Sequence, residues 1–225
     1  MTMTKGNHQK EIDHHVLRLI VGLIALLLPL FVIVLTTGNP LGSISASYHD
    51  DGAARDVFVG SLFAMAAFLF AYNGDHARQS TLSKLAAVSA VCIALFPTAG
   101  VSAPDTLATW VGVVHYLAAA VLFAVLAYFC WSFSCTAKNK GGTYREAGIR
   151  SLIYRVCLVG IGLAIVFMLA YLGFEEYLDE HFPRYIFFFE WLGLLAFGIA
   201  WLVASRIIPV ITHRDERLKL TAMMK

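Results

Sequence analysis

The residues whose types could do chemistry gather in one polar stretch and at three positions outside it. The stretch runs from 43 to 60 and holds hydroxyls, a histidine, three acids and an arginine between two apolar runs. Imidazoles combined with carboxylates are the ligand set of a catalytic zinc that leaves one position for water. The residues expected in catalysis are therefore Ser45, His49, Asp56, His115 and Glu190, and the expected zinc ligands are His49, Asp56 and His115.

A second group of residues is expected to bind a ligand beside this chemistry. It contains hydroxyl, phenol and guanidinium groups that could hold an oxyanion or a lipid head group: Ser43, Tyr48, Arg55 and Thr98. No H-x-x-x-H or H-E-x-x-H spacing accompanies them, so the chain has no local metal motif. The prediction of a site therefore depends on the fold bringing distant residues together.

Two of the candidates, His115 and Glu190, lie within apolar runs of the sequence, and each has a structural alternative. His115 is about eight residues into an apolar run, roughly 12 Å deep at helical rise. Charged groups in hydrocarbon are costly and are usually paired or functional. His115 could donate to a backbone carbonyl or a carboxylate, and Glu190 is expected to meet His115, Arg55 or an ordered water in a cavity that opens outward.

The loop candidates have structural alternatives of a different kind. Asp56 could cap the helix that follows it, because a side-chain oxygen there accepts orphan N–H groups. His49 could simply be solvated. The alternating hydroxyls of Ser43, Ser45 and Ser47 could bond to their own loop.

The elements that must position these residues are membrane helices. The chain has 225 residues, of which 59% are hydrophobic and 14% charged, whereas a soluble domain carries about 25% charged residues. Apolar runs of span length predict an all-α, six-helix transmembrane bundle over 16–208, with a cytoplasmic segment at 1–15 and a basic cytoplasmic tail at 209–225. The expected spans are 16–37, 57–72, 82–100, 107–131, 151–174 and 186–208.

The distribution of basic residues predicts the orientation of this bundle. Of the 17 lysines and arginines, the outer loops would hold only Arg55 and Arg184, so both termini are expected in the cytoplasm. The outer loops are also acidic. The net charge of +2 reflects this sidedness and indicates no nucleic-acid partner.

Several other features limit the possible classes. The N-terminal apolar run is too long for a signal-peptide core. None of the four cysteines (Cys92, Cys130, Cys135 and Cys157) falls in a predicted outer loop, which favours packing over a disulfide framework. No span interior has a lysine for retinal, only one histidine lies deep enough for haem, and Gly60-Ser61 has the wrong spacing for a rhomboid-like protease.

Small residues at helical spacing predict close helix contacts in the second half of the chain. Gly160 with Ala164 and Ala196 with Ala200 each form a small-xxx-small pair, and Gly193 lies one turn earlier. Such pairs let helix backbones approach each other in lipid. No two spans are interrupted at matching positions, so the paired broken helices of many transporters are missing from the sequence.

Five sequence features together resemble an uncharacterised family of bacterial six-helix inner-membrane proteins. They are Ser43-x-Ser45-x-x-Tyr48-His49, the run from Arg55 to Gly60, Leu95-Phe96-Pro97-Thr98, His115, and the run from Ala196 to Leu202. The resemblance spans about 40–204 and implies a bacterial inner-membrane location. More distantly, the chain is similar to the GPI-anchor-remodelling and autophagy-modulator membrane family.

The layout is also similar to the hydrolase superfamily of alkaline ceramidases and adiponectin receptors. That superfamily holds zinc with a serine, an aspartate and three histidines, which implies roles for Ser45, His49, Asp56 and His115. This chain differs in having six predicted spans and no late H-x-x-x-H pair.

We therefore expect an inner-membrane protein that binds a lipid or small molecule in a polar pocket facing outward. A zinc-dependent intramembrane lipid hydrolase, acting on an amide or ester, is the first alternative. A transporter or an assembly partner is the second. Membrane lipids are the expected partners, and the sequence leaves the oligomeric state open.

Overall fold

The computed structural model describes residues 14–37, 40–50, 52–98, 106–141 and 145–216, and the described chain is helical with no strand. The predicted segment 1–15 and the tail beyond 216 therefore lie almost entirely outside the described residues. The helices are α1 (His14–Leu35), α2 (Ala53–Ala71), α3 (Ala77–Leu95), α4 (Thr106–Lys140), α5 (Arg145–His181) and α6 (Tyr185–Ala204). Three short 3₁₀ turns accompany them: η1 (Ser45–His49), η2 (Pro209–Ile211) and η3 (Arg214–Glu216). The all-α prediction is confirmed.

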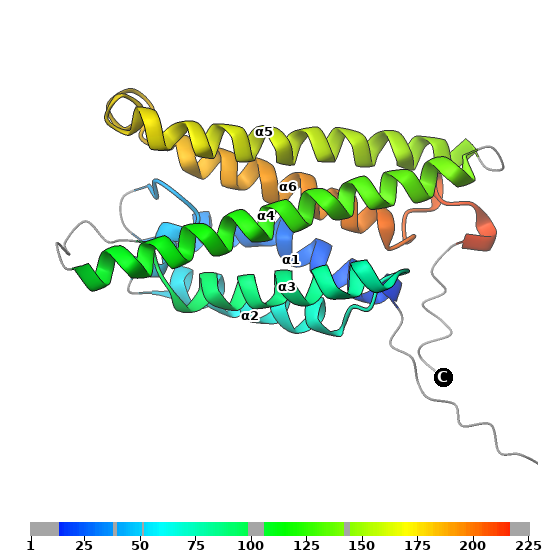
Figure 1. The fold of residues 1–225 in the computed structure, drawn as a ribbon, viewed down its shortest axis with the longest axis horizontal. Helices are drawn as coiled ribbons and strands as arrows, with labels where there is room; N and C mark the ends of the chain where they lie inside the picture. Colours follow the sequence, from blue (N-terminus) through cyan, green and yellow to red (C-terminus); the bar gives the residue numbers. More distant parts are fainter. Residues whose placement is uncertain (1–13, 38–39, 51, 99–105, 142–144, 217–225) are drawn as a thin grey trace, which may run out of the picture.

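The six helices form a closed ring of antiparallel neighbours (Figure 1). Each helix packs against the next one in the chain, and α6 returns to pack against α1. The start of α1 and the turn η3 lie at one end of the bundle, which we call the tail end (right in Figure 1). The turn η1 and the α5–α6 connection lie at the opposite end, which we call the loop end.

Five of the six helices are long and apolar enough to cross a membrane: α1, α2, α4, α5 and α6. They indicate a multi-pass protein embedded in a membrane. Helix α3 does not reach the same apolar character, because Arg78, Gln79 and Lys84 lie in its first turns. The six helices predicted from the sequence are all present, while a membrane span at α3, and with it the total of six spans, stays a prediction.

Helices α4 and α5 are longer than predicted, with 35 and 37 residues. At about 1.5 Å per residue each is longer than the roughly 30 Å hydrocarbon layer. The backbone of α5 leaves helical geometry at Phe174 (φ −132°, ψ 22°), where the fifth span was predicted to end. The exposed acids Glu175, Glu176, Asp179 and Glu180 follow this break, so the last turns of α5 form a polar surface at the loop end.

Small residues permit the closest helix contacts. A Cβ placed on Gly22 of α1 would lie 3.0 Å from the carbonyl oxygen of Gly198 in α6. A Cβ on Gly160 would lie 3.3 Å from that of Ala196, so these two small residues make a close helix contact, as the sequence predicts, and it joins α5 to α6. A Cβ on Gly193 would collide with the ring of Phe123, so this glycine lets α4 pack onto α6.

The cysteines follow the same packing logic. All four are free thiols, and Cys130 and Cys157 are buried in the hydrophobic core. A small polarisable side chain fits such positions without a polar partner.

Candidate functional site

The loop that precedes α2 holds itself together with its own hydroxyls. Ser43 Oγ lies 3.1 Å from Ser45 Oγ and accepts the N–H of Ala46 at 2.9 Å. Ser47 Oγ donates to the carbonyl of Ile44 at 2.6 Å. These contacts are the self-bonding that the serine alternation predicted, and they shape the tight turn η1.

Glu190 of α6 fastens this loop to the bundle. Its carboxylate accepts the N–H of Ile44 and the hydroxyl of Ser45, the latter at 3.0 Å, and the N–H of Ser45 lies 3.4 Å away. The first N–H groups of a helical turn have no partner within the turn, and no side chain of η1 caps them. Glu190 supplies that cap from another helix, so the expected pairing with His115 or Arg55 is wrong.

The two histidines meet at one short segment after α3. His49 Nε2 lies 2.8 Å from the carbonyl oxygen of Thr98, and His115 Nδ1 lies 2.8 Å from that of Phe96. A carbonyl accepts, so each of these ring nitrogens carries the proton. His115 is buried and bonds to a backbone carbonyl, as its structural alternative predicted, whereas His49 is exposed.

Asp56 does not join this pair through any bond among the described residues. It is exposed in the first turn of α2, whose N-cap is Gly52 without a side-chain cap bond. The capping alternative for Asp56 is therefore wrong. Within the described ranges, no group of three or more His, Cys, Asp or Glu side chains is close enough to hold a metal ion.

Arg55 and Tyr48 contact each other across the start of α2. The guanidinium carbon of Arg55 lies 4.7 Å from the centre of the Tyr48 ring. A cation over an aromatic face is a stabilising contact of about 0.5–1 kcal/mol at an exposed site. Of the four expected binding residues, Ser43, Tyr48 and Arg55 thus have partners within the loop region, and Thr98 meets His49 through its backbone.

A recess of about 200 Å³ opens at the loop end beside these groups. It lies between the end of α1 and the start of α6 and is lined by Ile33, Thr36, Pro40, Leu41, Arg184 and Phe187. Arg184 Nε donates to the carbonyl of Leu41 at 3.3 Å, and its guanidinium carbon lies 4.4 Å from the Phe187 ring. The terminal guanidinium nitrogens have no bonded partner among the described residues. The recess therefore combines one cation with a wall of both polar and apolar surface.

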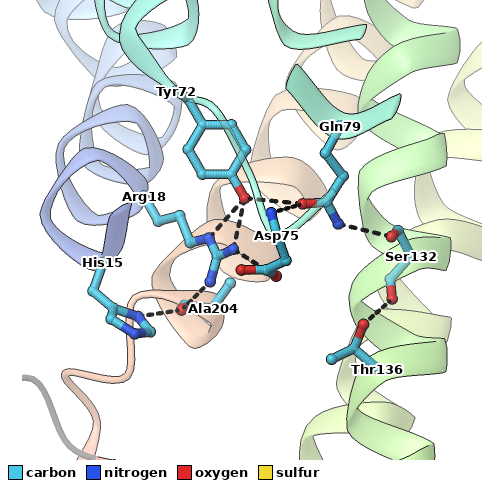
Figure 2. A network of polar contacts seen from close by, with 8 residues as sticks. All are labelled: His15, Arg18, Tyr72, Asp75, Gln79, Ser132, Thr136 and Ala204. Atoms are coloured by element: carbon cyan, nitrogen blue, oxygen red, sulfur yellow. Dashed lines mark hydrogen bonds and ion pairs between the residues drawn. The ribbon is translucent and has the colours of Figure 1, made fainter. Parts of the chain in front are cut away.

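The tail end carries a larger polar network, centred on Arg18 (Figure 2). Arg18 is 5% exposed although it lies in the apolar helix α1. Its guanidinium donates to the Tyr72 hydroxyl at 2.6 and 3.1 Å, to Asp75 Oδ2 at 3.1 Å and to the carbonyl of Ala204 at 3.4 Å. One side chain thus joins α1 to the end of α2 and the end of α6.

Asp75 reaches Arg18 because the chain turns sharply after α2. Gly74 adopts a left-handed conformation (φ 67°) that disfavours other residues, and a Cβ there would lie 2.6 Å from Gln79 Oε1. The same Gln79 oxygen accepts the N–H of Asp75 at 2.8 Å, and its amide donates to Ser132 Oγ at 2.9 Å. The network in Figure 2 therefore continues through α3 to α4.

A second ionic cluster at the tail end holds the turn η3 on the bundle. Glu216 forms ion pairs with Arg150 and Arg206, both at 2.7 Å, and with Lys140 at 3.3 Å. Arg150 is fully buried and also donates to the carbonyl of Ile211 at 2.7 Å. Burial opposes ionisation of Glu216, but the hydrogen bonds and charges of Arg206 and Arg150 outweigh it and lower the pKa to about 2.

The sequence prediction did not include these tail-end residues. Arg18 and Arg150 were counted only as markers of the cytoplasmic side. The available signal is their position: Arg18 lies between Leu17 and Leu19 near the predicted start of the first span, and Arg150 follows Ile149 directly before the predicted start of the fifth span. A guanidinium at such a depth needs acceptors, and Asp75 and Glu216 are the acids that supply them.

Comparisons with protein-family models, curated proteins and solved structures find no match to this chain. The resemblances suggested by the sequence motifs therefore stay predictions.

Proposed function

We propose that the protein is a six-span bacterial inner-membrane protein with its tail end in the cytoplasm. The tail end carries the basic residues Arg78, Lys84, Lys138, Lys140, Arg145 and Arg214, all of them exposed or half-buried. The loop end carries the acids that follow Phe174 together with Asp56. Basic residues collect on the cytoplasmic side of bacterial membrane proteins, which supports this orientation.

We further propose that the loop end binds the phosphate and glycerol region of a membrane lipid. The observation that carries this proposal is the recess of about 200 Å³ that Arg184 lines, because the terminal guanidinium nitrogens of this residue have no bonded partner among the described residues. Arginine matches phosphate oxygens with its planar fork of donors. The exposed side chains Leu30, Ile33 and Val34 of α1 continue from the recess, and they offer an apolar path for an acyl chain.

The test compares two arginines at the same end of the molecule. Native mass spectrometry of the purified protein would count the phosphatidylglycerol molecules retained by Arg184→Ala and by Arg55→Ala. We expect Arg184→Ala to lose the retained lipid, since Arg184 supplies the phosphate donors. The sequence also predicts Arg55 as a binding residue, but its guanidinium lies over the Tyr48 ring. Arg55→Ala removes the same charge there and, if the lipid binds at Arg184, leaves retention unchanged. Equal retention in the wild type and Arg184→Ala would contradict the proposal.

A zinc-dependent lipid hydrolase is the second candidate, supported by a different observation. The imidazoles of His49 and His115 both reach the segment from Phe96 to Thr98, and each has a second ring nitrogen that could ligate a metal. Ser45 Oγ lies 3.0 Å from Glu190, within the reach that a nucleophile and its base require. The zinc content of the purified protein tests this candidate: one bound zinc, lost in His115→Ala, would support it, and its absence from both proteins would exclude it.

A further inference from the structure

The Glu216 cluster has the composition of an anion-binding site. Three cationic side chains from three different parts of the chain converge on one carboxylate: Lys140 at the end of α4, Arg150 in α5 and Arg206 after α6. Both carboxylate oxygens are engaged, Oε1 by Lys140 and Oε2 by the two arginines. Glu216 supplies one negative charge against three positive ones, so these four bonded side chains carry a net charge of +2.

The donors at this site also outnumber the acceptors that Glu216 supplies. The Nε atoms of Arg150 and Arg206 are buried and have no hydrogen-bond partner in the described part of the chain. A buried donor without an acceptor is destabilising, and more so when it is charged. A group with more oxygens and more negative charge than a carboxylate would satisfy this set of donors better.

The backbone conformation at Arg206 also positions these donors. Arg206 has φ 62°, which makes it the one non-glycine residue in the left-handed region within the described ranges. A non-glycine residue in this region is strained and persists only where the surroundings impose it. Here it turns the chain out of α6 so that the guanidinium of Arg206 faces Glu216 at 2.7 Å.

We propose that Lys140, Arg150 and Arg206 form a binding site for a phosphate group, which Glu216 occupies in this structure as an internal competitor. Glu216 lies on the short turn η3, which is fastened to the bundle by this carboxylate and by the bond from Arg150 to Ile211. A phosphate can displace it because three or four oxygens and up to two charges replace two oxygens and one charge. The phosphate can come from a lipid head group at the tail-end surface or from a free ion.

The experiment removes the competitor and keeps the donors. In Glu216→Gln the side chain retains its size and loses its charge, so inorganic phosphate titrated onto the purified protein in a neutral detergent should bind about tenfold more tightly than to the wild type. Lys140 is half-exposed, so Lys140→Ala in the Glu216→Gln background should fold and lose the added affinity. Arg214→Ala, an exposed change of charge on the same turn, is the matched control and should bind phosphate as the wild type does.

A second measurement distinguishes the two sources of the phosphate. Native mass spectrometry of Glu216→Gln, with phosphatidylglycerol and phosphatidylcholine offered in turn, shows whether lipid retention rises. A rise with phosphatidylglycerol but not with inorganic phosphate assigns the site to a lipid head group, and the reverse assigns it to a free anion. If neither rises and Glu216→Gln only lowers thermal stability, the proposal is overturned and Glu216 serves to fasten the turn.

Discussion

The two ends of the bundle satisfy their polar side chains in different ways. At the loop end, Glu190, His49 and His115 bond to backbone groups or to a neighbouring hydroxyl. At the tail end, Arg18, Arg150 and Arg206 bond to carboxylates and a phenol on other elements. Substituting a side chain that bonds to backbone loosens one loop. Substituting one partner of a buried ion pair leaves the other partner buried without its counter-charge. The loop end should therefore tolerate substitution better than the tail end.

The strongest test of this difference is Tyr72→Phe at the tail end. It removes the oxygen that accepts two bonds from the buried Arg18 and should lower the free energy of unfolding by about 2–3 kcal/mol, since a charged donor is left unpaired. Thermal unfolding in detergent measures the change. Tyr128→Phe is the control, because the Tyr128 hydroxyl has no bonded partner among the described residues. Equal stability of the two variants would show that Arg18 finds another acceptor.

A second test uses the pH dependence of the Glu216 cluster. The pKa of Glu216 is about 2, below the value of about 4.3 for an unperturbed glutamate. The carboxylate therefore stabilises the folded turn fully above the unfolded pKa, and this contribution is lost as the pH falls toward 2. Hydrogen exchange of the amides from Val210 to Glu216 should accelerate over that interval beyond its intrinsic pH dependence. Glu216→Gln should show fast exchange of this turn at every pH, and a wild-type profile in that variant would contradict the assignment.

The comparison also explains which features the sequence could predict. The apolar runs of α1, α2, α4, α5 and α6 predict helices because backbone groups in lipid must be bonded within the segment. The serine alternation predicted the self-bonded loop because short hydroxyl side chains reach only nearby backbone. The partner of Glu190 could not be predicted in the same way, since every residue carries the N–H groups that Ile44 and Ser45 offer.

The tail-end pairs escaped prediction for a different reason. Arg18 and Asp75, like Arg150 and Glu216, come from helix ends and turns that only the closed ring brings together. Their charges agreed with the expected sidedness of the membrane, so nothing in the local sequence marked them as buried. The third span is predicted from residue 82, whereas α3 begins at Ala77. Its first turn is polar and includes Gln79 of the Arg18 network, so the apolar pattern does not mark it.

A third test addresses the loop end directly. Glu190→Gln keeps an oxygen that can accept the N–H of Ile44 but lacks the charge, so it should cost about 1 kcal/mol, less than Tyr72→Phe. Thermal unfolding in detergent provides the value, and Glu176→Gln, an exposed residue at the same end, provides the control. A cost above that of Tyr72→Phe would reverse the order of the two ends and would make Glu190 the main anchor of the bundle.

The smallest effect is expected for His49→Ala. His49 is exposed, and its acceptor is the carbonyl of Thr98 at 2.8 Å. Water can replace the imidazole at an exposed carbonyl, so the change in the free energy of unfolding should stay within about 0.5 kcal/mol. His76→Ala, at an exposed residue that makes no cap bond to α3, gives the matched control at the tail end. A loss above about 1 kcal/mol in His49→Ala alone would show that the segment after α3 depends on this bond, and the loop end would then be held by its imidazoles as well as by Glu190.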